Sequence, residues 1–114
     1  MVTKPLYEAK AEFFRTLGHP ARIRVLELLC DREHAVHELL EQIDIGPSNL
    51  SHQLAVLRRN GLIAQTRRDG EVRYGIAVPE IRDLLMAARA ILLDVLTDQD
   101  SLKRELRSGQ RASS

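Results

Sequence analysis

The dipeptide Asp69-Gly70 lies between two short runs of strand-forming residues, and this arrangement restricts the local fold to a β-hairpin. A two-residue loop of type I′ needs positive φ at both central residues, which Asp tolerates and Gly adopts freely. The sequence therefore predicts a hairpin over residues 62–76. Because side chains alternate along a strand, one face of the second run is expected to carry Val72, Tyr74 and Ile76.

Two helices are predicted at the start of the chain. Apolar residues recur at helical spacing over residues 6–17, and Gly18 marks a stop. Pro20 fits the first turn of the next helix, where its missing N–H would be unpaired in any case. That helix is expected to run to Cys30, which ends its apolar side.

Two further helices complete the part of the chain before the hairpin. A short helix is predicted over residues 36–43. The next begins at Pro47 and ends at Gly61, which we expect in a left-handed cap. The pattern predicts a mainly α fold with a small β-hairpin, in the order α-α-α-α-β-β-α.

A long last helix is predicted from about residue 80 to 96, and its apolar stripe is too wide for packing on one side of a small domain. Left uncovered, such a stripe would form an unusually large apolar patch. We therefore expect residues 1–100 to form one domain that dimerises, followed by a mobile tail over 101–114. The expected interface comprises Leu6, Phe13, Leu17, Ile81, Leu84, Leu85, Ala88, Ile91, Leu92 and Val95.

Charge and cysteine content narrow the class of protein. The 17 Lys and Arg residues against 16 Asp and Glu give a net charge of +1, which excludes a grossly basic DNA-coating protein but permits local basic patches. The single cysteine, Cys30, cannot form an intrachain disulfide and favours a reducing compartment. No signal peptide or membrane span is visible, so a cytoplasmic protein without a membrane partner is expected.

Polar side chains gather in the first turns of the helix that begins at Pro47, in front of a leucine stripe. Serine and asparagine near a helix start are often caps. Asn and Gln can also pair with adenine, and Ser and His can bond base edges or phosphates. The number of these residues, backed by leucines, favours a base-reading face made by Ser48, Asn49, Ser51, His52 and Gln53.

Basic residues cluster around the predicted hairpin turn. Four helices, one of them with a polar face, followed by a hairpin with a basic tip, describe a winged helix-turn-helix. In that arrangement the polar helix enters the major groove and the hairpin reaches the flanking DNA. Arg22 fits a phosphate contact or a structural ion pair equally well. The expected wing contacts are Arg67, Arg68 and Arg73.

Three segments of the chain resemble the ArsR/SmtB family of bacterial winged-helix repressors: FFRTLGHPARIRVLELL, AVHELLEQIDIGPSNLSHQLAVLRRNGLI and RRDGEVRYGI. The resemblance covers about residues 6–96. It implies a homodimer joined through the first and last helices. It also implies binding to an imperfect palindrome in double-stranded operator DNA and release by an effector. By this resemblance, the family's recognition-helix positions correspond to Ser48, Asn49, Ser51, His52 and Gln53, and its wing positions to Arg67, Arg68 and Arg73.

The family's metal ligands are not matched by this sequence. The Cys-x-Cys positions hold Ala35 and His37. The four ligand positions of the last helix fall on Val78, Glu80, Ile91 and Asp94, so both imidazoles are missing. Two carboxylates alone are a poor site for zinc. We therefore expect no metal and no cofactor.

Some alternatives stay open at this point. Cys30, His34 and His37 have a ligand-like spacing, and Cys30 has the chemistry for a simple thiol modification, but both uses are disfavoured. A winged helix can serve as a protein-interaction module without reading DNA. An enzyme is the weakest alternative, because no nucleophile motif, phosphate loop or catalytic carboxylate pair can be placed. The amino-acid sequence does not identify the effector, the operator sequence or the regulated genes.

Overall fold

The computed structural model describes residues 3–113, with side chains described through residue 108. The chain divides into two units, the first ending at Ile81 and the second beginning at Arg82. No helix within the described range is long and apolar enough to cross a bilayer.

The first unit opens with two helices whose ends follow local chemistry. Helix α1 spans Leu6–Leu17 and α2 spans Pro20–Asp31. The N-cap of α2 is His19, whose Nδ1 accepts a hydrogen bond from the backbone N–H of Ala21 at 3.2 Å. Pro20 occupies the first helical position, where no donor is lost. The expected boundaries of both helices are thus confirmed to within a residue.

Two shorter helices follow. Helix α3 spans Val36–Gln42, and the Glu38 carboxylate accepts a hydrogen bond from the N–H of Ala35 at 2.9 Å. Helix α4 spans Pro47–Arg59. The largest fully buried side chains come from α2, α3 and α4, which together enclose an aliphatic core. These core residues are Val25, Leu26, Leu39, Leu50, Leu54 and Leu57.

The end of α4 forms a complete Schellman cap. Gly61 has φ +75°, as expected for a left-handed residue that follows a helix. Its N–H donates to the Arg58 carbonyl at 3.0 Å, and the N–H of Leu62 donates to the Leu57 carbonyl at 3.0 Å. The cap satisfies two terminal carbonyls and redirects the chain into the first long strand.

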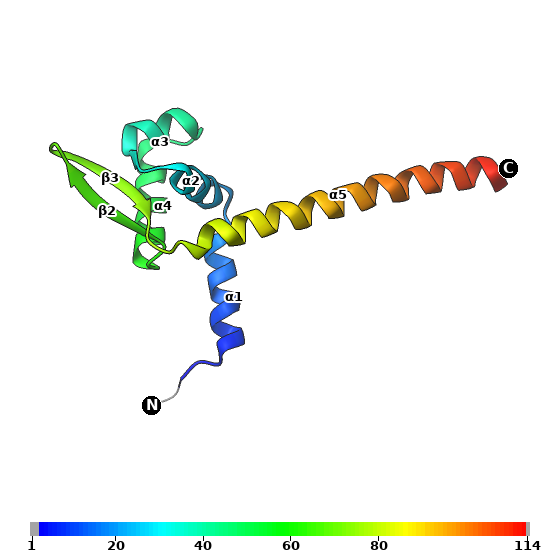
Figure 1. Ribbon diagram of the computed structural model, residues 1–114, viewed down its shortest axis with the longest axis horizontal. Coiled ribbons are helices and arrows are strands. Elements are labelled where there is room, and N and C mark those ends of the chain that lie inside the picture. The colour runs from blue at the N-terminus through cyan, green and yellow to red at the C-terminus, as the bar shows by residue number, and fades with distance from the viewer. Residues whose placement is uncertain (1–2, 114) are drawn as a thin grey trace. The chain divides into compact units, whose positions relative to one another are not determined.

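The hairpin consists of β2 (Ile63–Arg68) and β3 (Glu71–Ile76), which pair antiparallel. Asp69 and Gly70 have φ of +52° and +77°, so the prediction of positive φ at both loop residues is confirmed. Arg68 pairs directly with Glu71 across the loop. Figure 1 shows the hairpin extending away from helices α2 and α4.

A third strand was not predicted. The short strand β1 (His34–Ala35) pairs antiparallel with β3 and gives the sheet the order β1-β3-β2. Two residues are too short to produce a period-2 pattern, so the sequence offers no signal for this strand. The observed order of elements is therefore that of a winged helix-turn-helix with one additional strand at the edge of the wing.

Helix α5 spans Glu80–Ser113, so the expected helix end near Leu96 is wrong. The reason is that residues 97–108 contain neither Pro nor Gly and include Asp100, which lies three positions before Lys103 and four before Arg104. Such spacing supports a helix. The mobility of residues 101–114 stays a prediction, and Ser114 lies outside the described residues.

Candidate nucleic-acid interface

Four of the five polar residues predicted on α4 are exposed. The N-cap of α4 is Gly46, and no side chain makes a capping hydrogen bond there. Ser48 and Asn49, in the second and third helical positions, therefore do not cap the helix. Both residues are exposed, on a helix whose opposite side is fixed in the core. The exposed residues are Ser48, Asn49, Ser51 and His52.

Gln53 differs from its neighbours, because only 4% of it is exposed. Its Oε1 accepts a hydrogen bond from Arg22 Nε at 2.7 Å, and its Nε2 donates to Asn49 Oδ1 at 2.9 Å. Arg22 also donates to the Thr16 carbonyl at 3.0 Å. These contacts are hydrogen bonds to an amide and a carbonyl oxygen, so among the described residues Arg22 does not form the ion pair that was one of its two expected roles. The sequence held a signal for the burial of Gln53, which lies three residues after Leu50 and four before Leu57.

The three wing arginines are also in different situations. Arg67 is exposed and has one long hydrogen bond, to the Gly70 carbonyl at 3.4 Å. The Arg68 side chain is 69% exposed and lies 3.3 Å from the Glu33 carboxylate. The Arg73 side chain is only 22% exposed. Arg67 and Arg68 therefore present charge to solvent, whereas Arg73 points into the protein.

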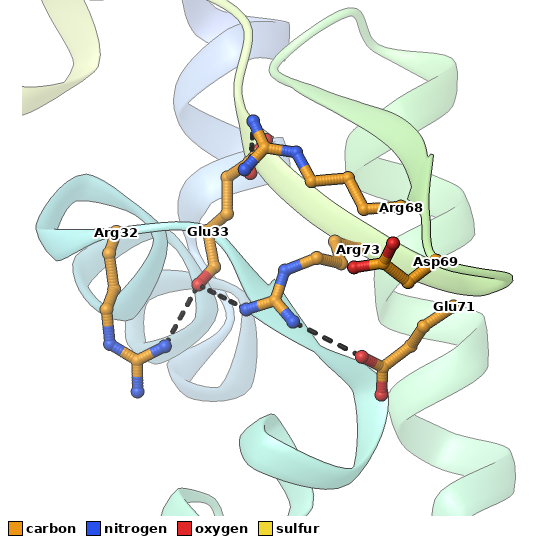
Figure 2. Close-up of a pocket in the computed structure, with 6 residues that line it drawn as sticks. All are labelled: Arg32, Glu33, Arg68, Asp69, Glu71 and Arg73. Atoms are coloured by element: carbon orange, nitrogen blue, oxygen red, sulfur yellow. Dashed lines mark hydrogen bonds and ion pairs between the residues drawn. The ribbon is translucent and has the colours of Figure 1, made fainter.

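Arg73 joins the hairpin to the segment before α3. It forms ion pairs with Glu38 at 3.0 Å and with Glu71 at 3.3 Å. Figure 2 shows that Arg73 and Arg32 both point toward the backbone carbonyl of Glu33, to which they donate at 3.4 and 3.1 Å. These contacts fix the orientation of the wing relative to α3 and the segment that precedes it.

Glu38 is the most strongly perturbed carboxyl of this network. Its pKa is lowered to about 2, first by the hydrogen bond from the Ala35 backbone N–H and then by that from Arg32. The charge of Arg73 contributes further to the low pKa. No role is expected for Glu33 or Glu38 from the sequence, because the contacts that tie them to the wing, Arg68 for Glu33 and Arg73 for Glu38, lie on distant strands.

A cavity of about 400 Å³ lies beside this network. Its lining contains three arginines and three acidic residues, so the formal charges cancel. Figure 2 shows that the arginines are directed at oxygen atoms of the protein itself. The cavity therefore does not present a positive site for an anion. It is lined by Arg32, Glu33, Arg68, Asp69, Glu71 and Arg73.

The histidines near α3 interact within the protein. His34 is buried, and its Nδ1 lies 2.8 Å from the Arg32 carbonyl. His37 Nε2 lies 2.9 Å from the Glu71 carboxylate. Across the described residues, no three His, Cys, Asp or Glu side chains are grouped so as to hold a metal ion.

The residues predicted at a dimer interface fall into three sets by exposure. Leu17 and Ile81 are buried within their own chain, so little of their surface is left for a partner. Phe13, Leu84 and Leu85 are of intermediate exposure. Exposed apolar side chains occur on α1 and along α5, where they continue past the predicted helix end to Leu102 and Leu106. The exposed members of the predicted set are Leu6, Ala88, Ile91, Leu92 and Val95.

The sequence and fold match known regulators. Residues 19–65 match the family described as bacterial regulatory protein, arsR family. The HTH-type transcriptional regulator Rv0081 of Mycobacterium tuberculosis is 53% identical over 116 residues, which cover 99% of this chain and 100% of Rv0081. This chain belongs to the arsR family of bacterial regulatory proteins. The crystal structure of Rv0081 matches with a TM-score of 0.78 at 52% identity, over 85% of this chain and 98% of that one.

Two other similar proteins extend the comparison. The biofilm growth-associated repressor of Xylella fastidiosa is 35% identical over 81 residues, which cover 71% of each chain. The homodimeric winged helix-turn-helix DNA-binding domain Mb0332 of Mycobacterium bovis has a TM-score of 0.71 over 84% of this chain and 94% of that one. At 22% identity this likeness shows the fold alone.

Membership of the arsR family gives the functional class of this chain. It is a transcriptional regulator with a winged helix-turn-helix DNA-binding fold, a class without enzymatic activity. The predicted family, fold and regulatory function are confirmed.

Proposed function

We propose that this chain is a homodimeric repressor that binds an inverted-repeat operator in double-stranded DNA. Each protomer inserts the start of α4 into the major groove and lays its wing on the flanking DNA. Two such helices related by a two-fold axis read half-sites separated by about one turn of DNA. The effector that releases the repressor is left unassigned, and the chain is proposed to act in the cytoplasm without a membrane partner.

One observation carries the DNA contact: the exposed polar groups at the start of α4 have no capping role. A serine or asparagine at a helix start is normally explained by capping. Here the N-cap is Gly46, which has no side chain, and no side-chain capping bond is made at the start of α4. Leu50 and Leu54 are buried beneath the same turns and fix their direction. A rigid helix end that offers donors and acceptors to solvent suits base edges in a major groove.

The proposal divides the predicted contact residues by exposure. Base contacts are assigned to the exposed residues of α4, and phosphate contacts to Arg67 and Arg68. Gln53 and Arg73 are assigned supporting roles, since their polar groups are already bonded inside the protein. The proposed DNA-contacting residues are Ser48, Asn49, Ser51, His52, Arg67 and Arg68.

A second copy of the chain is proposed to cover the apolar side chains of α5. Leu92 is 58% exposed, and Ile91 and Val95 beside it are exposed as well. A continuous apolar stripe of this kind is costly in water. The homodimeric state of Mb0332 supports a dimer for this fold. Together with exposed residues of α1, the stripe is the proposed interface.

The test of the proposed function is selection of DNA by the full chain. Sheared genomic DNA and randomised 24-bp duplexes would be incubated with the protein, and bound sequences determined over several salt concentrations. We expect an enriched inverted repeat, salt-sensitive affinity, and repression of a reporter placed behind that repeat. The double variant N49A/S51A should lose the preference, whereas T97A on α5 should keep it. Equal enrichment of all sequences by the unaltered chain would contradict the proposal.

A further inference from the structure

Three polar side chains form a continuous hydrogen-bonded row from α2 to the exposed start of α4. Arg22 Nε donates to Gln53 Oε1 at 2.7 Å, and Gln53 Nε2 donates to Asn49 Oδ1 at 2.9 Å. The middle member is 4% exposed, whereas Asn49 is open to solvent. The row therefore connects a buried amide with a proposed DNA-contacting residue.

The direction of every bond in this row is determined by Arg22. A guanidinium has donors and no acceptor. Gln53 must therefore turn its oxygen toward Arg22, which leaves its NH₂ group to face Asn49. Asn49 in turn must offer its oxygen to Gln53. The oxygen of Asn49 is thus engaged by the protein, and its NH₂ group, with two donors, is turned outward.

We infer that Arg22 and Gln53 are positioning residues that make Asn49 a hydrogen-bond donor toward DNA, so that it selects an acceptor on a base edge. Guanine presents two acceptors in the major groove, O6 and N7. An unconstrained asparagine pairs with adenine through its oxygen and its NH₂ together. The inference rests on the proposed function, and it specifies which chemical group α4 offers at one position of the operator.

A single substitution should reverse this polarity. In Q53E one carboxylate oxygen still accepts from Arg22, while the other faces Asn49 and accepts instead of donating. Asn49 would then turn its NH₂ group inward and its oxygen outward. The outward oxygen favours a base with an exposed amino group, such as cytosine N4 or adenine N6. Q53L removes both bonds, so the Asn49 amide can turn either way.

The experiment selects sites from randomised duplexes with the unaltered chain, Q53E, Q53L and Q42E. Gln42 is exposed at the end of α3, so Q42E adds the same charge without entering the row. Dissociation constants are then measured on the best site of the unaltered chain with each of the four bases at every position. We expect roughly 5- to 150-fold discrimination for an acceptor base at one position. Q53L should reduce this discrimination, Q53E should change the preferred base, and Q42E should do neither.

The outcomes separate this inference from the proposed function. If the unaltered chain enriches no sequence, both are overturned. If it enriches a site and Q53E and Q53L keep the same base at every position, the positioning role is overturned and the proposed function stands. Uniform loss of affinity on all sequences by Q53L would also overturn it, because a merely structural residue would act in that way. Should Q53L fail to fold, Q53E decides alone, since it retains an acceptor for Arg22.

Discussion

The guanidinium of Arg68, near the tip of the wing, lies 3.3 Å from the carboxylate of Glu33, which precedes β1. Glu33 is held from two other sides. Thr66 Oγ1 is 3.5 Å from its second oxygen, and the side chain crosses β3 so closely that a Cβ on Gly75 would lie 3.2 Å from Glu33 Cγ. The wing cation proposed to meet phosphate thus already has an internal anionic partner, with which DNA must compete.

Replacing Arg68 with alanine should weaken binding to all DNA sequences. Each phosphate contact releases counterions, so its loss should reduce the slope of log K against log salt by about 0.9 for each protomer. Binding titrations at four salt concentrations, on a selected site and on random DNA, measure both quantities. The matched control is R24A, which removes an exposed arginine that is also paired with a glutamate, Glu27. A change in base preference in R68A would contradict the assignment to phosphate.

Replacing Glu33 with glutamine should strengthen DNA binding. The substitution removes the anion that competes for Arg68 and keeps the shape that fits over Gly75. Exposed ion pairs contribute about 0.2–1 kcal/mol, so the gain should be roughly 1.5- to 5-fold in affinity at low salt. The gain should be absent in the double variant E33Q/R68A. An equal gain with and without Arg68 would show that only the overall charge matters.

The network around Glu38 predicts a specific acid sensitivity. The folded-state pKa of Glu38, about 2, lies below the ordinary value of 4.5. Its contribution to stability is therefore complete above about pH 4.5 and is lost as the pH falls toward 2. Urea unfolding across this interval should show a shallower decline for E38Q than for the unaltered chain. R32M should remove only part of the effect, because the Ala35 N–H is the largest cause of the low pKa. Identical declines for all three proteins would contradict the prediction.

Local chemistry was sufficient to predict much of this fold. The type I′ loop at Asp69-Gly70 and the cap at Gly61 each depend on residues adjacent in sequence, and both occur where expected. The supporting contacts of the site could not be found in this way. Arg22 and Gln53 are 31 residues apart, and Arg73 and Glu38 are 35 apart. Pairings across such distances follow from tertiary packing, which residue patterns do not specify.

The same contrast explains why residue type alone places Gln53 among its exposed neighbours. Its residue type resembles theirs, but its position three residues after Leu50 places it on the buried side. For a polar residue on a helix, spacing relative to the leucines is thus a better guide to exposure than residue type. The difference in the length of α5 has another cause. The predicted end at residue 96 coincides with the end of the apolar run, but no helix-breaking residue lies between 97 and 108, so the helix continues.

Gly61 provides a test of the cap that ends α4. No neighbouring atom lies within 4 Å of an added Cβ, so substitution should act through the backbone alone. At φ +75° a Cβ costs about 1–2 kcal/mol, and G61A should lower the free energy of unfolding by that amount. G61N should lose less, because asparagine tolerates the left-handed region. Urea denaturation of the three proteins at one pH measures the difference. Equal losses for Ala and Asn would mean that the strain does not lie in φ.

The apolar stripe of α5 predicts a dimer that a single charge weakens. Leu92 is exposed in the isolated chain, and burial of a leucine contributes about 1.5–3 kcal/mol. L92E should therefore raise the dimer dissociation constant by at least about tenfold, as measured by sedimentation velocity over a concentration series. It should weaken binding to a two-half-site duplex more than to a single half-site, because only the dimer bridges both. T97E places the same charge five residues further along, roughly opposite the stripe, and should leave the dimer intact. Dimers of equal affinity for L92E and T97E would place the interface elsewhere on the chain.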